Sequence, residues 1–307
     1  MNPAISNLIK YIPLIVGLSI LCIGSFFVPW REVLPYFSRL SSTSYISIAV
    51  LGGAYYLARI FRYYYMLGLL GSPRTLRQTA VSYFIAQPIS LLPAGEMYRI
   101  IALKEHGNVP TTKGISVVFV QSLTESIALV LLALISALYL NQDILIILAL
   151  LLLYGAVFVL THSRRTAEKS SRFVNRFPFI HIPLPKFLSF LHKNRTLLSG
   201  KSLVALSLSG FVSSIFAVAL LYILARDLDI DLNLTEATIA FALPTVLQNV
   251  TFLPGGIGVN EQSTIGILVL LGSPLPAAVA LTLIMRFVTL ILGVILGLIS
   301  FLFQERK

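Results

Sequence analysis

The sequence predicts an all-α polytopic membrane protein, and three observations lead to this prediction. Of its 307 residues, 57% are hydrophobic and only 11% are charged, whereas a soluble domain carries about 25% charged residues. Several apolar runs reach about 20 residues, the length that a helix needs to cross the hydrocarbon core of a bilayer. A stretch rich in proline and glycine occurs twice, each time between apolar segments. We therefore expect about six full transmembrane helices and two re-entrant broken-helix units in one membrane domain, residues 1–307.

The repeated stretch covers residues 90–107 in its first copy and residues 251–268 in its second. An offset of 161 residues superposes four pairs: Pro93 on Pro254, Gly95 on Gly256, Gln87 on Gln248 and Glu125 on Arg286. Irregular backbone and ionisable side chains are costly in hydrocarbon unless they line a cavity or a site. The two copies predict a first repeat over residues 45–160 and a second over residues 202–303.

Taken in chain order, the apolar runs predict full spans at residues 11–28, 45–70, 112–140, 144–160, 202–225 and 277–303. No small-residue cleavage site follows the first run, so we expect a retained helix there. Residues 29–44 are expected to form a polar connection. The re-entrant units are expected at residues 75–105 and 235–271, because proline, glycine and amide side chains interrupt both.

Charge sets the expected orientation. Residues 161–201 carry nine basic side chains and one acidic side chain, Glu168, and the positive-inside rule puts such a loop in the cytoplasm of a cell-membrane protein. The acidic connection 226–231 then lies outside, and both termini are cytoplasmic. The two repeats start three crossings apart, so their orientations are opposite. Inverted repeats whose broken helices meet near the bilayer midplane are typical of transporters.

The second break is the stronger site candidate. Pro254, Gly255, Gly256 and Gly258 permit backbone geometry that side chains with a Cβ atom resist. The half-helix after the break is expected to start near Val259, with its free amides facing an anion at the midplane. Glu261 then orients the site or carries a proton. The alternative is a kinked helix in which the glycines allow close packing and Glu261 pairs with Arg286.

The first break, at Pro93 and Gly95, is followed by Glu96 and Arg99, which are three residues apart and share a helix face. In a headgroup site, Arg99 would hold a phosphate and Glu96 would tune it or contact an amine. The alternative is an ion pair between the two side chains near the cytoplasmic interface.

Three further groups of polar residues lie inside apolar runs. Glu125 and Arg286 are related by the repeat and are expected to face each other, as a gate or as a structural tie. Gln248 and Asn249 are expected to support the site. Arg59 and Arg62, three apart among tyrosines, form either an interfacial belt or the entry point of a lipid phosphate. The sequence does not separate these alternatives.

Several other classes of function are not expected. The net charge of +11 lies mostly in loops, which indicates orientation and contact with anionic lipids rather than nucleic acid. The single cysteine, Cys22, excludes a disulfide or a thiolate metal site within the chain. No histidine pair has metalloprotease spacing, and no nucleophile-elbow or Walker motif occurs. We expect no enzyme activity, no metal and no cofactor.

Two motifs resemble those of a known family. Residues 253–261 read LPGGIGVNE and are followed by an apolar stretch and Arg286, while Gly95, Glu96 and Arg99 form a Gly-Glu-x-x-Arg pattern. Both resemble the lysylphosphatidylglycerol synthase transmembrane (flippase-like) family, and the similarity spans nearly the whole chain. The resemblance implies a membrane-embedded lipid translocator, which some members carry fused to a soluble aminoacyl-transferring domain. Because the chain ends four residues after Phe303, synthase activity is not expected.

The sequence departs from the family pattern in two places, and both bear on headgroup specificity. Ala94 stands where the family often has a basic residue. Gln121, Ser122 and Glu125 occupy positions where the family usually has a Glu-Arg-x-x-Asp pattern.

The expected function is a lipid flippase-like transporter that moves a phospholipid or a polyprenyl-phosphate-linked lipid between leaflets through a midplane cavity. Its expected partners are membrane lipids, anionic ones above all, and a separate lipid-modifying enzyme. One alternative is a proton-coupled transporter of a small anion, with Glu261 or Glu125 as the proton carrier. Another is a non-transporting membrane scaffold whose basic loop recruits a partner.

Overall fold

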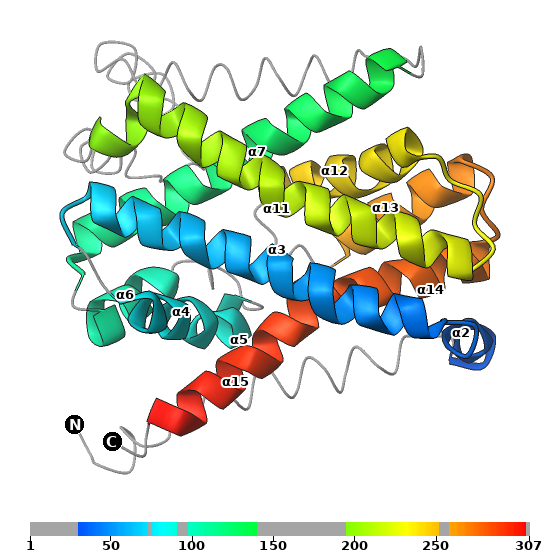
Figure 1. Cartoon of the computed structure of the whole chain (residues 1–307), viewed down its shortest axis with the longest axis horizontal. Coiled ribbons are helices and arrows are strands. Elements are labelled where there is room, and N and C mark those ends of the chain that lie inside the picture. The colour runs from blue at the N-terminus through cyan, green and yellow to red at the C-terminus, as the bar shows by residue number, and fades with distance from the viewer. Residues whose placement is uncertain are drawn as a thin grey trace, which may run out of the picture.

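The computed structural model describes residues 30–72, 75–90, 98–107, 109–139, 195–251 and 258–304. These ranges are helical and contain no strand (Figure 1). Four helices in them are long and apolar enough to cross a membrane: Ser42–Leu69, Thr111–Tyr139, Gly200–Asp227 and Leu275–Ser300. They confirm a helical membrane protein. The spans expected at residues 11–28 and 144–160, and most of the basic loop, lie outside the described residues.

Two long antiparallel helices cross the centre of the molecule side by side, α3 (Ser42–Leu69) and α11 (Gly200–Asp227) (Figure 1). Each begins at a serine N-cap, Ser41 or Ser199, whose hydroxyl accepts from an amide in the first turn. Each ends in the same turn, with a positive φ of 61° at Gly71 and 55° at Asp229. In both turns the next amide bonds back to a carbonyl in the last helical turn, as in a Schellman cap.

Side chains from other helices stabilise both ends of α3. At its start, the Oδ2 atom of Asp227 accepts from the Ser41 amide at 2.6 Å and from the Ser44 hydroxyl at 2.7 Å. At its end, the Nζ atom of Lys113 donates to the Leu70 carbonyl at 2.6 Å and to Ser72 Oγ at 3.0 Å. An anion at a helix N-terminus and a cation at its C-terminus both complement the helix dipole. These bonds tie α3 to its neighbours at both ends.

Short helices flank the long pair. In the first half these are α4 (Leu76–Ile85), α5 (Gln87–Ser90) and α6 (Tyr98–Gly107). In the second half they are α12 (Leu234–Thr251) and α13 (Val259–Leu270). The chain between them, at residues 91–97 and 252–257, lies outside the described residues and holds most of the two predicted breaks. Helix α4 packs on α6, and α12 packs on α13.

The last helix that the structure describes in each half packs against helices of the other half. Helix α7 (Thr111–Tyr139) packs along α12, and α15 (Leu292–Gln304) packs against α4 and α5. This crossed packing joins the two halves, and the α7–α12 contact encloses a small hydrophobic cluster beside the larger core.

One expectation about local structure was wrong. The connection expected at residues 29–44 contains a helix, α2 (Trp30–Phe37), and also the start of α3. Helix α2 packs against α14 (Leu275–Arg286), with Val33 fully buried and with Tyr36 and Phe37 packed partly buried against the hydrophobic core. The expected last span is present at Leu275–Ser300, and it contains a π-helical turn, η4 (Phe287–Ile291), directly after Arg286. Such turns are frequent at functional sites.

Candidate functional site

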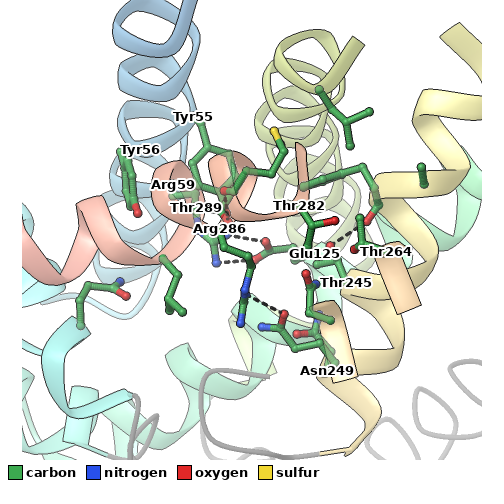
Figure 2. Close-up of a pocket in the computed structure, with 18 of the residues that line it drawn as sticks. Tyr55, Tyr56, Arg59, Glu125, Thr245, Asn249, Thr264, Thr282, Arg286 and Thr289 are labelled. Atoms are coloured by element: carbon green, nitrogen blue, oxygen red, sulfur yellow. Dashed lines mark hydrogen bonds and ion pairs between the residues drawn. The ribbon is translucent and has the colours of Figure 1, made fainter. Parts of the chain in front are cut away.

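A polar cavity of about 100 Å³ lies where the two halves meet (Figure 2), which is enough room for several water molecules. The helices that contribute lining residues are α3, α4, α5, α6 and α7 from the first half, and α11, α12, α13, α14 and η4 from the second. Its charged lining residues are Arg59, Arg99, Arg286 and Glu125. The neutral polar lining comprises three tyrosines, four threonines and four side-chain amides.

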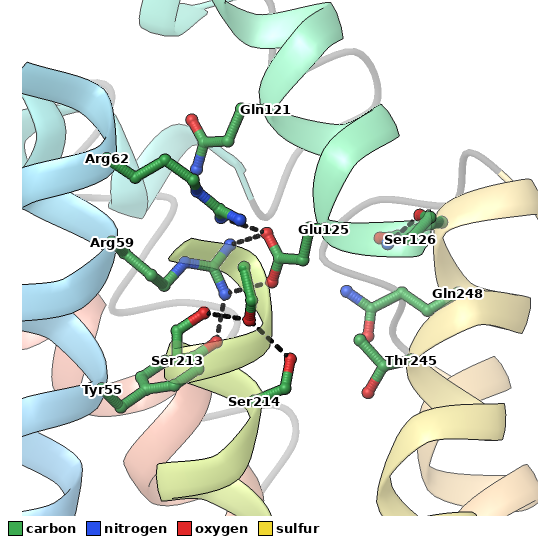
Figure 3. A network of polar contacts seen from close by, with 12 residues as sticks. Tyr55, Arg59, Arg62, Gln121, Glu125, Ser126, Ser213, Ser214, Thr245 and Gln248 are labelled. Atoms are coloured by element: carbon green, nitrogen blue, oxygen red, sulfur yellow. Dashed lines mark hydrogen bonds and ion pairs between the residues drawn. The ribbon is translucent and has the colours of Figure 1, made fainter. Parts of the chain in front are cut away.

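Glu125 on α7 is held by two arginines of α3 (Figure 3). Arg59 binds it in a bidentate manner, with Nη1 at 2.8 Å from Oε1 and Nη2 at 3.0 Å from Oε2. Arg62 Nη2 lies 2.8 Å from the same Oε2 atom. The Arg62 side chain is 0% exposed and that of Arg59 is 16% exposed. Burying such a charge in an apolar medium is costly unless an opposite charge compensates it, and Glu125 supplies that charge.

These contacts place Arg59 and Arg62 inside the protein. Their shared helix face is confirmed, because both reach one carboxylate. An interfacial belt does not describe Arg62, whose guanidinium is enclosed by α3, α7 and α11. Gly210 on α11 makes room for it, since a Cβ atom at Gly210 would lie 2.8 Å from Arg62 Nη1. Gln121, one turn before Glu125, is also buried, and neither of its amide atoms has a hydrogen-bond partner in the described part of the chain.

Arg286, at the end of α14, belongs to a second network. Its Nε atom lies 2.5 Å from Glu261 Oε1, and its Nη1 atom lies 3.4 Å from Gln248 Oε1. Glu261 Oε2 accepts from the Gly258 amide at 2.7 Å, where Gly258 has a φ of 88°. The Glu261–Arg286 pair expected for a kinked helix is therefore present. Helix α13 does begin at Val259, but Glu261 occupies the Gly258 amide that was expected to face an anion.

Among the described residues, the ion pairs at the cavity form within each half of the protein rather than between the halves. Glu125 and Arg286 were expected to face each other, and both line the cavity. Glu125, however, pairs with arginines of the first half, while Arg286 pairs with a carboxylate of the second half. The reason is proximity, because each charge meets a partner on a helix packed beside its own.

Three pairs of cavity-lining residues are separated by the 161-residue offset of the repeated sequence. Gln87 and Gln248, Glu125 and Arg286, and Arg99 and Asn260 are each 161 positions apart, and all six residues line it. Asn249, beside Gln248, donates from Nδ2 to the Ser126 hydroxyl at 2.9 Å and so links α12 to α7. Gln87 was predicted only as one member of a pair, and Asn260 was not among the predicted site residues. Both could have been found from the offset, because each lies 161 positions from a predicted site residue.

Of the nine predicted site residues that the structure describes, six line this cavity. Those that line it are Arg59, Arg99, Glu125, Gln248, Asn249 and Arg286. Arg62 and Glu261 lie behind Glu125 and Arg286 and contact them directly. Six predicted residues lie outside the described part of the chain: Pro93, Gly95, Glu96, Pro254, Gly255 and Gly256.

Two of the tyrosine rings that line the cavity contact arginines. The guanidinium of Arg59 lies over the Tyr55 ring and that of Arg99 over the Tyr83 ring, each 5.1 Å from the ring centroid, which is within cation–π range. Arg59 also donates to the Tyr55 hydroxyl. Within the described ranges, no cluster of three or more His, Cys, Asp or Glu side chains could hold a metal ion. The chemistry of the cavity is that of arginines, hydroxyls and amides.

Comparison with known proteins gives one family. Residues 13–297 match the family described as the lysylphosphatidylglycerol synthase TM region. No curated protein gives a significant match.

Proposed function

Because this match covers nearly the whole chain, the protein belongs to the lysylphosphatidylglycerol synthase TM family, and we propose that it is a lipid flippase-like transporter. The family is one of membrane proteins involved in lipid handling. The cargo would be a phospholipid or a polyprenyl-phosphate-linked lipid, moved between leaflets through the polar cavity. The proposal assigns no chemical step to the chain.

The observation that carries the proposal is the set of three arginines, Arg59, Arg99 and Arg286, around one cavity. Charged side chains inside membrane-spanning helices are costly and are usually functional. Arginine is also the side chain whose planar fork best matches the oxygens of a phosphate group. Both cargo classes contain such a phosphate, and their acyl or prenyl chains would remain in the surrounding hydrocarbon.

Alternating access would follow from an inverted repeat. Several features support such a repeat: the antiparallel pair α3 and α11 with identical end turns, the crossed packing of α7 and α15, and the paired lining residues. The two re-entrant units would then lie at the repeat interface, where transporters of this kind bind their cargo. Rocking of one half against the other would expose the cavity to each leaflet in turn.

The orientation and partners complete the proposal. The basic loop at residues 161–201 and both termini would lie in the cytoplasm, with the protein in the cell membrane. Anionic membrane lipids would be attracted to this loop, and a separate lipid-modifying enzyme would supply modified cargo.

The test is leaflet accessibility in liposomes that contain the purified protein. Fluorescent phospholipids and a fluorescent polyprenyl phosphate would be placed in both leaflets, and a membrane-impermeant reductant would quench the outer label. The native protein is expected to expose inner-leaflet label, and Arg286→Gln and Arg59→Gln should slow this exposure at least about ten-fold. Arg226→Gln is the matched control, because Arg226 is an exposed arginine that binds Tyr222 at the end of α11, outside the cavity.

If neither lipid class is quenched beyond the outer half, lipid transport is excluded. The alternative is then a proton-coupled transporter of a small anion, because the same arginines would bind a soluble anion. Uptake of labelled phosphate into the same liposomes under a pH gradient tests this alternative directly.

A further inference from the structure

We propose that Glu261 couples cargo binding to proton uptake: when the phosphate of the cargo engages Arg286, the Glu261 carboxylate takes up a proton from the aqueous phase. This inference rests on the proposed lipid transport and supplies its energy source, since a proton gradient would then drive the cargo towards the less acidic side. Its basis is the different way in which the two described carboxylates at the cavity, Glu125 and Glu261, are held.

Glu261 and the cargo would share one cation. Arg286 lines the cavity (Figure 2), and its Nε atom lies 2.5 Å from Glu261 Oε1. A phosphate that binds Arg286 therefore brings a second negative charge close to Glu261. A like charge nearby disfavours the ionised form of a carboxyl group. The phosphate diester of a phospholipid is a much stronger acid than a carboxylic acid, so the phosphate stays charged and Glu261 takes the proton.

Glu261 would keep its place when it is protonated. Its Oε2 atom accepts from the Gly258 amide at 2.7 Å, at the start of α13. This bond belongs to a capping box, in which a glutamate or glutamine side chain binds the amide three residues before it. A protonated carboxyl group still offers that amide an acceptor oxygen. The side chain therefore stays beside Arg286 and pairs with it again once the cargo and the proton leave.

Glu125 is held too firmly for this exchange. It accepts three hydrogen bonds from Arg59 and Arg62, which together use both of its oxygens. A phosphate at Arg59 would leave it Arg62, which lies behind the lining. The Glu125 side chain is 9% exposed, whereas that of Glu261 is 25% exposed. Of the two carboxylates, Glu261 is therefore the one that exchanges its cation for a proton.

The charged groups of the chain around Glu261 are the same with and without cargo. Helix α13 packs on α12 and α14, which carry one ionisable side chain each, Glu236 in the first turn of α12 and Arg286 at the end of α14. Outside the described residues, 252–257 contain no ionisable side chain and 91–97 contain one, Glu96. The other charged residues at the cavity lie on other helices: Arg59, Arg62, Arg99 and Glu125.

Proton coupling can be measured as a pH dependence of binding. The thermal stability of the native protein in detergent would be titrated with dioctanoyl phosphatidylglycerol, whose phosphate diester stays ionised throughout the range tested. The bound state holds one more proton than the free state, so the affinity should rise as the pH falls. Between about pH 7.5 and about pH 5.5 we expect at least about five-fold tighter binding. An affinity that is constant or falls over this range would overturn the inference.

A variant locates the proton. Glu261→Gln removes the ionisable group and keeps an oxygen for the Gly258 amide. The pH dependence should disappear, and at the higher pH the variant should bind the lipid at least about five-fold more tightly than the native protein, because no carboxylate competes for Arg286. Glu236→Gln is the matched control. Glu236 also binds the amide three residues before it, that of Asn233, and in the described ranges it forms no ion pair, so the native pH dependence should remain.

Two results with variants would overturn the inference. One is a folded Glu261→Gln variant that keeps the native pH dependence. The other is loss of the pH dependence in Glu96→Gln, which would assign the proton to Glu96. If Glu261→Gln does not fold, the native protein decides: a pH indicator in weakly buffered solution should record about one proton taken up for each lipid bound. Binding without proton uptake would contradict the coupling.

Two further experiments separate the source of the phosphate and the transport step. Dimethyl phosphate carries the same phosphate diester without acyl chains, and binding as tight as that of the lipid would overturn the lipid source. In liposomes, pH-dependent binding without flipping removes the transport proposal alone. Flipping at one rate with and without a pH gradient, together with pH-independent binding, removes the coupling alone.

Discussion

Replacing Glu125 by glutamine removes the carboxylate that compensates two buried arginines. Arg59 and Arg62 would remain in the interior, where their guanidinium groups now lie within 3.0 Å of Glu125 oxygens. Removing one partner of a buried ion pair costs about 3–5 kcal/mol, because an uncompensated charge stays behind. We therefore expect Glu125→Gln to lower the free energy of unfolding by about that amount.

Replacing one of the two arginines should lower the free energy of unfolding by less. In Arg62→Met, the bidentate pair of Arg59 and Glu125 persists as one cation with one anion, and methionine fills much of the same volume. Combining the two substitutions leaves Arg59 as the single cation of this group. The double variant should therefore be more stable than the sum of the single effects predicts, with a coupling of about 1–3 kcal/mol.

The assay is reversible unfolding of the detergent-solubilised protein, followed by circular dichroism, for all four members of the cycle. Two results would refute the reasoning. One is a Glu125→Gln variant that loses less than about 1 kcal/mol, and the other is a coupling energy close to zero. Either would mean that water or another group compensates the arginines.

Three further substitutions test the packing around the site by the same unfolding assay. Gly210→Ala should destabilise the protein by about 1–3 kcal/mol, because the new methyl group meets Arg62 Nη1 at 2.8 Å, whereas Gly53→Ala, with nothing within 4 Å, should be neutral or slightly stabilising. Asp227→Asn should cost about 1–2 kcal/mol, because the start of α3 loses a charged acceptor. Lys113→Met should cost about 1 kcal/mol, because the end of α3 loses a cation that binds its last carbonyl. No loss in any of these three variants would show that the packing and capping contacts contribute little to stability.

Glu125 shows which features of the site could be predicted from the sequence. A carboxylate inside a long apolar run is recognisable without any structure, because no lipid-facing helix tolerates one easily. Its partners were not predictable in the same way. The offset of 161 residues related it to Arg286, and the two do line one cavity, but the ion pairs follow helix packing. Helix α7 lies against α3, so Arg59 and Arg62 reach Glu125 first.

The surroundings of Arg62 could not be predicted from the sequence either, whereas helix α2 could have been. An arginine near tyrosines late in a span is typical of a membrane interface, and only the close approach of α11 at Gly210 shows that Arg62 is enclosed. The apolar residues Trp30, Val33 and Phe37 of α2 recur at helical spacing, so the sequence did carry a signal for a helix there that the expected polar connection did not use, and contact with α14 stabilises this helix.

By itself, the sequence determined that this is a helical membrane protein, that a stretch rich in proline and glycine occurs twice and that ionisable side chains lie inside apolar segments. These properties depend on composition and on local spacing, which the chain carries wherever its helices lie. The tertiary structure decided which charges meet and which polar side chains share the cavity. Those properties depend on contacts between helices far apart in the chain, and the spacing of residues along one helix contains no record of its neighbours.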